Sequence, residues 1–161
     1  TERLNQVQGR VYQSGCNAVL GDGRCTIALD LPAYRTTAAL SGFDAQGRIV
    51  IDGQTGFADR WFERGQLLVL TGASAGLAVM IRADKLTGTG RVIDLWHETG
   101  ASLAPGDTVQ LTAGCDRRAT TCQTKFDNFL NFRGFPHIPG EDWLTSYPVR
   151  SRANDGGSLG G

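Results

Sequence analysis

The four cysteines of this chain form two pairs near opposite ends of the sequence, and this distribution constrains the fold more than any other feature. Cys16 and Cys25 enclose eight residues, and Cys115 and Cys122 enclose six. A centre that used all four thiols would hold both ends of the domain together. In the chain-entropy model, closing a loop of about 100 residues contributes roughly 4.7 kcal/mol, more than closing a loop of about ten residues. The distribution therefore favours one shared metal centre.

The spacing of the cysteines does not identify the metal. Structural zinc sites usually place two to four residues between paired ligands, and neither gap fits that pattern. The compact cysteine run of bacterial ferredoxins is also absent. Three uses of the thiols stay open on this ground: a shared metal ion or cluster, two local disulfides, or free buried thiols. Arg24, Arg117 and Arg118 stand beside the cysteines, where they would offset the negative charge of thiolates.

Length and charge limit the classes of protein to which the chain can belong. Its 161 residues, 40% of them hydrophobic, suit one domain with a real core. Sixteen basic and 16 acidic residues give a formal net charge of zero, which offers no argument for nucleic acid or an anionic membrane as a partner. No apolar run approaches the roughly 18 residues that cross a bilayer, so we expect no membrane span.

Short apolar segments separated by turn residues dominate the sequence and predict an all-β fold, a barrel or a sandwich. Strands are also predicted on both sides of the first cysteine pair, which would then lie at the facing ends of two strands. The predicted strands are 9–13, 25–31, 35–41, 48–52, 65–70, 76–83, 91–96 and the segment that follows the turn at Pro105–Asp107.

The C-terminal part of the chain departs from the strand pattern. Residues 118–131 predict a short helix, with Phe126, Phe129 and Leu130 on the same face as Cys122. Residues 132–148 form an irregular segment rich in aromatic residues and proline. We expect this segment to be a flap that closes one end of the barrel and shields the metal; the alternative is an exposed protein-binding surface. The predicted domain spans 1–150, and 151–161 is expected to be a disordered tail or linker.

Catalytic patterns are missing from the sequence. His97-Glu98 resembles the start of a zinc-protease helix, but Ala101 stands where the second histidine would be needed. His137 lies between two prolines, which favours a structural or interface role. The sequence has neither a nucleophile elbow nor a phosphate-binding loop. We therefore expect that the protein is not an enzyme.

Both ends of the chain contain distinctive stretches, which cover about a third of the sequence and include all four cysteines. They are Leu4-Asn5-Gln6, Gly9-Arg10-Val11-Tyr12, Cys16, Leu20-Gly21-Asp22, Cys25, Gly114-Cys115-Asp116-Arg117-Arg118, Cys122, Phe126 and Asn131-Phe132-Arg133-Gly134-Phe135-Pro136-His137-Ile138-Pro139-Gly140. These stretches resemble the family of the tail hub proteins of phages and gene transfer agents, which are related to tail tip protein L of lambda-like phages.

The resemblance implies a cofactor and a location. Proteins of this type carry a [4Fe-4S] cluster, and carrying the ligands over by position assigns Cys16, Cys25, Cys115 and Cys122. The implied role is structural, in a trimeric hub that closes the tail tube of a virion made in the bacterial cytoplasm. The implied partners are a distal tail protein, a central tip or fibre protein and other copies of the hub. A further hub domain is expected upstream of this chain.

Two other functions stay open on the sequence. The first is a small redox module that uses the same iron-sulfur cluster. The second is a metal-free β domain that binds glycans or cell walls through Trp61, Trp96 and Trp143.

Overall fold

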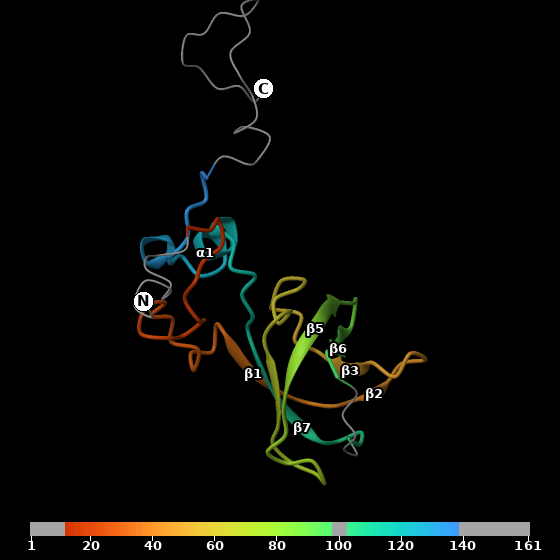
Figure 1. Cartoon of the computed structure of the whole chain (residues 1–161). Coiled ribbons are helices and arrows are strands. Elements are labelled where there is room, and N and C mark those ends of the chain that lie inside the picture. Colours follow the sequence, from red (N-terminus) through yellow and green to blue (C-terminus); the bar gives the residue numbers. More distant parts are fainter. Residues whose placement is uncertain (1–11, 98–102, 139–161) are drawn as a thin grey trace, which may run out of the picture.

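The described part of the chain folds into a seven-stranded antiparallel sheet that curls into a half-barrel, with one short helix beside it (Figure 1). The computed structural model describes residues 12–97 and 103–138. The sheet order is β1-β7-β4-β5-β6-β3-β2. The strands are β1 (Arg35–Ala39), β2 (Gly42–Phe43), β3 (Ile49–Asp52), β4 (Gln66–Val69), β5 (Ala78–Leu86), β6 (Gly90–Leu95) and β7 (Thr108–Thr112). They are followed by α1 (Ala119–Thr124) and the 3-10 turn η2 (Phe129–Asn131).

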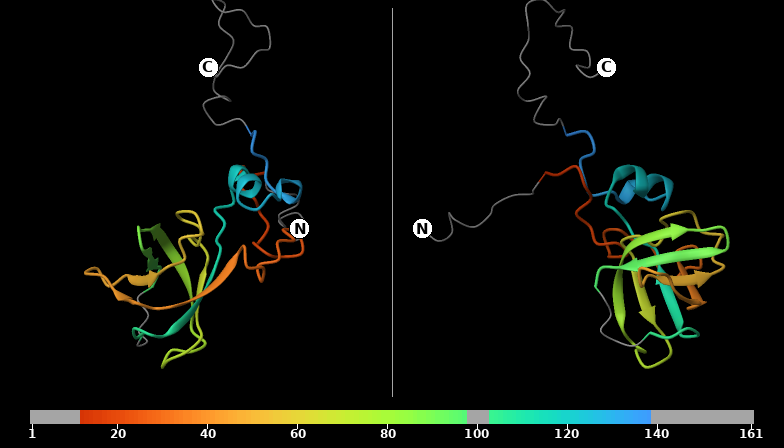
Figure 2. Two further views of the ribbon diagram at one scale, coloured as in Figure 1. Left: turned by 180° about the vertical axis from the view of Figure 1, so that it is seen from behind. Right: turned by 90° about the vertical axis from the view of Figure 1, so that its right-hand side faces the viewer.

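Two features curl the sheet. The long strand β5 pairs with β4 through its first residues and with β6 through the rest, and its register shifts between Ile81 and Ala83. A bulge of this kind bends a strand and increases its twist. The second feature is the passage from β1 to β2, which stays within the sheet. The Leu40 N–H donates to the Asp107 carbonyl oxygen beside β7, and the Ser41 N–H donates to Val50 O on β3. Two further views show the resulting curved sheet (Figure 2).

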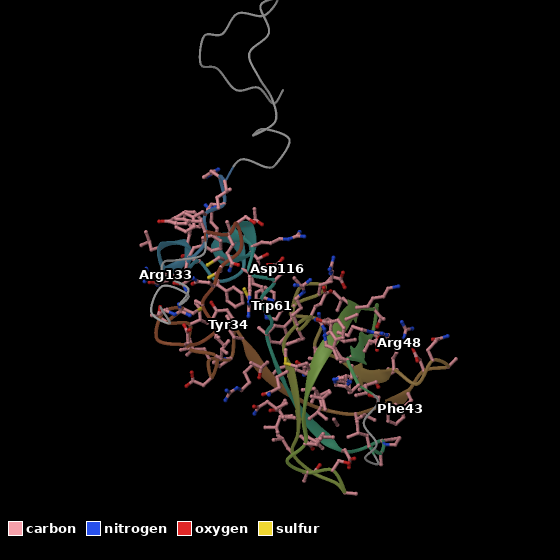
Figure 3. All side chains as sticks on the ribbon, viewed as in Figure 1. Tyr34, Phe43, Arg48, Trp61, Asp116 and Arg133 are labelled. Atoms are coloured by element: carbon pink, nitrogen blue, oxygen red, sulfur yellow. The ribbon has the colours of Figure 1, made fainter. Side chains whose placement is uncertain are left out.

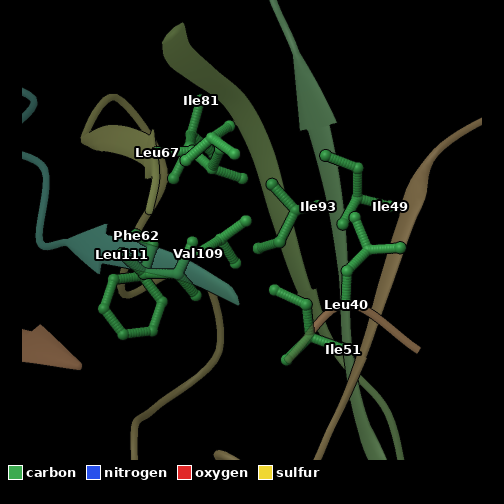
Figure 4. Close-up of a cluster of buried hydrophobic side chains, with 10 residues drawn as sticks. Leu40, Ile49, Ile51, Phe62, Leu67, Ile81, Ile93, Val109 and Leu111 are labelled. Atoms are coloured by element: carbon green, nitrogen blue, oxygen red, sulfur yellow. The ribbon is translucent and has the colours of Figure 1, made fainter. Parts of the chain in front are cut away.

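The inner face of the half-barrel is filled by aliphatic side chains and one phenylalanine. Alternate residues along β3, β4 and β7 are buried, as expected for strands with one face in a core. Figure 4 shows these side chains pointing into the space between the strands. The cluster consists of Leu40, Ile49, Ile51, Phe62, Leu67, Val69, Ile81, Ile93, Val109 and Leu111.

A buried ion pair holds the loop between β3 and β4 against this core. The side chains of Asp84 on β5 and Arg91 on β6 are both fully buried and joined by two hydrogen bonds of 2.8 and 2.7 Å. The remaining guanidinium N–H groups donate to the carbonyl oxygens of Gln54, Phe57 and Ala58. The Asp84 carboxylate also accepts the Phe62 N–H at 2.8 Å. The pair therefore replaces regular strand pairing as the anchor of residues 54–62.

The predicted all-β class is confirmed, and each strand predicted between residues 35 and 112 overlaps an observed strand. The strand predicted over 25–31 is wrong: these residues form turns, and Thr26 has a φ of 63°. The strand predicted over 9–13 is absent at residues 12–13, and the rest lies outside the described residues. The first cysteine pair is consequently held by loops, not by strand ends.

The helix predicted over 118–131 is shorter than expected. It ends at Thr124, and the φ of 45° at Asp127 turns the chain before η2 begins. Threonine, asparagine and aspartate compete with the helix through their own side-chain hydrogen bonds, which explains the early end. Leu130 therefore becomes 96% exposed while Phe126 is buried, so the predicted common face is wrong.

The remaining C-terminal predictions are tested only in part. Residues 132–138 are irregular, as predicted, whereas the rest of the flap and the tail at 151–161 lie outside the described residues. No helix in the described part of the chain is long and apolar enough to cross a membrane.

The buried pair gives a stability prediction. Arg91→Met should lower the free energy of unfolding by about 3–5 kcal/mol, because it leaves the Asp84 carboxylate buried without a partner. Arg82→Met is the matched control, since Arg82 pairs with Asp94 on the surface and should cost less than about 1 kcal/mol. Urea unfolding followed by circular dichroism measures both. Equal, small losses in the two variants would contradict the anchoring role of Arg91.

Candidate metal centre

The two ends of the described chain meet beside the half-barrel. In Figures 1 and 2 the first described segment lies against the segment that contains α1 and η2. Backbone hydrogen bonds join them: Cys16 N–H to Arg117 O at 2.9 Å, Asn17 N–H to Arg133 O at 3.3 Å, and Phe135 N–H to Gln13 O at 2.9 Å. These bonds bring loops from opposite ends of the sequence into one layer.

All four cysteines line one cavity in this layer. The cavity has a volume of about 320 Å³, many times the roughly 30 Å³ that one water molecule occupies in the liquid. Each cysteine is half-buried, and no disulfide joins any of the four, all of which lie in the described part of the chain. The apolar part of the lining includes Ala18, Leu20, Ile27, Phe126 and Phe132.

Three of the four sulfur atoms have an N–H group directed at them. The Arg117 amide donates to Cys115 Sγ at 3.3 Å, and the Arg133 amide donates to Cys16 Sγ at 3.4 Å. The side-chain amide of Asn128 lies 3.9 Å from Cys25 Sγ. Such donors stabilise negative charge on sulfur and are among the factors that tune thiolate-bound clusters. The chemistry of this donor set therefore fits a thiolate-bound group.

Asn128 connects the two cysteine loops. Its side chain is 9% exposed and donates to the carbonyl oxygen of Cys25, while its backbone N–H donates to Cys122 O at 3.0 Å. The Asn128 carbonyl in turn accepts a hydrogen bond from the Cys122 thiol at 3.3 Å. Asn131 extends the link by donating to Thr26 Oγ1 at 3.0 Å. Sequence reasoning missed Asn128, because a single asparagine beside a predicted helix carries no distinctive pattern.

Burial raises the pKa of two of the four thiols. Burial, and then the charges that Cys115, Cys16 and Cys25 would carry, raise the pKa of Cys122 to about 11. Burial also raises the pKa of Cys115, although the Arg117 N–H acts in the opposite direction. The four sulfur atoms are thus close enough to affect one another. Metal binding to such thiols must displace their protons.

The cysteines surround a space and do not converge on a point. Within residues 12–97 and 103–138, no group of three or more His, Cys, Asp or Glu side chains is arranged to hold a metal ion. The two histidines, His97 and His137, are exposed. All four thiols line one cavity, whereas their role as ligands and the group that they would hold stay predictions.

A half-buried lysine holds the chain directly before Cys115. The Lys125 ammonium donates to Gly114 O at 2.7 Å and to the carbonyl oxygen of Trp61, and lies 4.7 Å from the centre of the Trp61 ring. Burial lowers the pKa of Lys125 to about 8. At Gly114 a Cβ atom would come within 2.0 Å of the Glu63 carbonyl oxygen, so only glycine fits directly before Cys115.

The arginines predicted to stand near the thiols divide into two groups. Arg117 and Arg118 line the cavity. Arg24 points elsewhere: it donates to Asn17 O at 3.0 Å and pairs with Asp22 at 3.5 Å. Arg64, which sequence reasoning missed, also lines the cavity. It comes from the loop that the buried ion pair anchors, a contact that no sequence pattern reveals.

The aromatic residues of the predicted flap have different roles. Phe126 and Phe132 line the cavity, in agreement with a shielding role, while Phe129 and Phe135 are 45% and 41% exposed. Trp143 and Tyr147 lie outside the described residues. Figure 3 shows Arg133 and Asp116 in the layer that contains α1, with Tyr34 and Trp61 between this layer and the sheet.

Comparison with known proteins identifies the family. Residues 60–142 match the model of the family described as phage conserved hypothetical protein BR0599, which is just over half of the chain. A solved structure described as the virion of a native gene transfer agent particle contains a chain with 54% sequence identity and a TM-score of 0.77. The match covers 98% of this chain and 54% of that chain, so this chain spans about half the length of that virion protein.

A search of curated proteins gave no match. The similarity that the sequence suggested, to proteins of phages and gene transfer agents, is thus found independently in the family model and in the solved structure. The chain belongs to the phage conserved hypothetical protein BR0599 family.

Proposed function

We propose that this protein is a structural component of a phage or gene transfer agent virion, located in the hub at the tail tip. The match to a gene transfer agent virion chain over nearly the whole length of this chain supports the virion location. The resemblance of both chain ends to tail hub proteins supports the place within the particle. The partners would be other virion proteins: a distal tail protein, a central tip or fibre protein and other hub copies, which would form a trimer.

We further propose that Cys16, Cys25, Cys115 and Cys122 hold a [4Fe-4S] cluster. One observation carries this proposal: four thiols from both ends of the sequence line a single cavity of about 320 Å³. In such a cluster each cysteine binds a different iron atom, so the sulfur atoms stand apart around a volume. This requirement agrees with four thiols that line a cavity without forming a group for one metal ion.

The cluster would act as a staple. The cavity lies where the two ends of the chain are joined by a few backbone hydrogen bonds, so a group bound to all four thiols would fix this layer to the half-barrel. The glycan-binding alternative has less support, because the Lys125 ammonium covers one face of the Trp61 ring. Trp96 is 59% exposed, and Trp143 lies outside the described residues.

Metal analysis tests the cluster. Protein purified without oxygen should contain about four irons per chain and show broad visible absorption from sulfur-to-iron charge transfer. Cys115→Ser should lose most of this absorption, whereas Ser14→Ala, outside the cavity lining, should keep it. Stoichiometric zinc without iron, or unchanged absorption in Cys115→Ser, would refute the cluster and leave the hub proposal standing.

Asn128 should hold the cysteine loops around the cluster. Asn128→Ala removes the bond to Cys25 O and should lower the free energy of unfolding by about 1–3 kcal/mol. It should also speed the loss of visible absorption when an iron chelator is added. Asn17→Ala is the matched control, because Asn17 is exposed and lies in the loop between Cys16 and Cys25. Identical chelation rates in the two variants would show that Asn128 has no such role.

Immunogold electron microscopy tests the location in the virion. Particles that carry a peptide tag on this protein should be labelled at the free end of the tail, because a hub closes the tail tube. Label on the capsid or along the tube would contradict the hub proposal, whatever the metal content.

A further inference from the structure

We propose that the mouth of the cysteine cavity is a docking surface for a segment of another protein that carries acidic residues around an apolar side chain. The cavity mouth is defined here by the lining residues that are exposed, which are Val19, Arg64, Met80, Arg117 and Arg118. The partner would belong to the particle of the proposed function, and in this respect alone the inference rests on that proposal.

The charge of the cavity mouth is strongly one-sided. Three arginines and no acidic residue of the described chain line the cavity, although the whole protein has no net charge. Arg64 and Arg117 are exposed, and neither guanidinium forms an ion pair or a side-chain hydrogen bond with any residue that the structure describes. Arg118 has only a distant pairing with Asp116, at 3.8 Å. Free guanidinium groups bind carboxylates through two parallel hydrogen bonds.

The apolar part of the cavity mouth is held by a fixed backbone. Val19 is 60% exposed, and its turn is closed by hydrogen bonds from the Val19 N–H to Asp22 Oδ2 and from the Asp22 N–H to the Val19 carbonyl oxygen, both 3.0 Å. Met80 is 49% exposed on β5, where it lies opposite Gln66 of β4. A side chain held out by a fixed backbone loses little conformational freedom when a partner covers it. An exposed valine in such a position is therefore suited to binding.

The combination selects the chemistry of the partner. Arginine and methionine are enriched in protein interfaces, and charges across an interface are complementary. A second copy of this chain bound through the same face would place the arginines of both copies opposite one another, which is unfavourable. A simple polyanion would use the arginines and leave Val19 and Met80 uncovered. An acidic segment with an apolar anchor satisfies both parts of the cavity mouth.

Peptide binding tests the proposal. The probe is a ten-residue peptide with four glutamates around a Leu-Phe pair, and the matched peptide has glutamines in place of the glutamates. Isothermal titration should detect binding of the acidic peptide only, and the double variant Arg64→Ala/Arg117→Ala should weaken it by about ten-fold or more. Val19→Ser should also weaken it. Phe43→Ser and Arg48→Ala, on the far side of the molecule in Figure 3, should leave the affinity unchanged.

Several results would overturn the proposal. They are equal affinity for both peptides, no binding at millimolar concentration, and affinity insensitive to the two arginines or to Val19. Self-association of the protein that Val19→Ser abolishes would assign the surface to a second copy. Iron is measured on the same samples. Peptide binding without iron would support the docking surface and refute the cluster. Iron without peptide binding would support the cluster and refute the docking surface.

Discussion

The hydrogen bond from the Cys16 N–H to the Arg117 carbonyl oxygen joins two loops that are about 100 residues apart in the sequence. The half-barrel makes this contact possible but does not include it, because both loops lie beyond the ends of the strands. Every feature of the candidate centre depends on this meeting: the shared cavity, the amide groups directed at sulfur, and the link through Asn128. A layer joined by so few bonds benefits from a bound group that touches both loops.

The half-barrel supports this layer through a chain of specific contacts. The Asp84–Arg91 pair fixes the loop before β4, and this loop carries the Trp61 and Glu63 carbonyl oxygens. These two oxygens lie against Lys125 and Gly114 respectively, next to Cys115. Burial of an ion pair costs free energy that a hydrophobic pair would not. Here the pair fixes the position of a loop that has no regular structure. The position of this loop in turn fixes the path of the chain from the end of β7 to Cys115.

Much of the fold follows from local sequence, and most of the site does not. Alternating residues in β3, β4 and β7 reveal their buried face directly, so the all-β class could be predicted. That cysteines from both ends of the chain lie together could also be predicted, since only four are present. Arg64, Lys125 and Asn128 could not, because they reach the cavity through tertiary contacts. The residues around Cys25 show strand-like alternation, yet the contacts of Asp22 and Asn128 hold them in turns.

We propose above that the cavity between the four cysteines holds an iron-sulfur cluster. Diffraction from a crystal of protein prepared without oxygen, measured on both sides of the iron absorption edge, would reveal this cluster. We expect anomalous density with the extent of a four-iron cluster, bounded by the sulfur atoms of Cys16, Cys25, Cys115 and Cys122. A single zinc peak, or disulfide bonds within the two cysteine pairs, would contradict it.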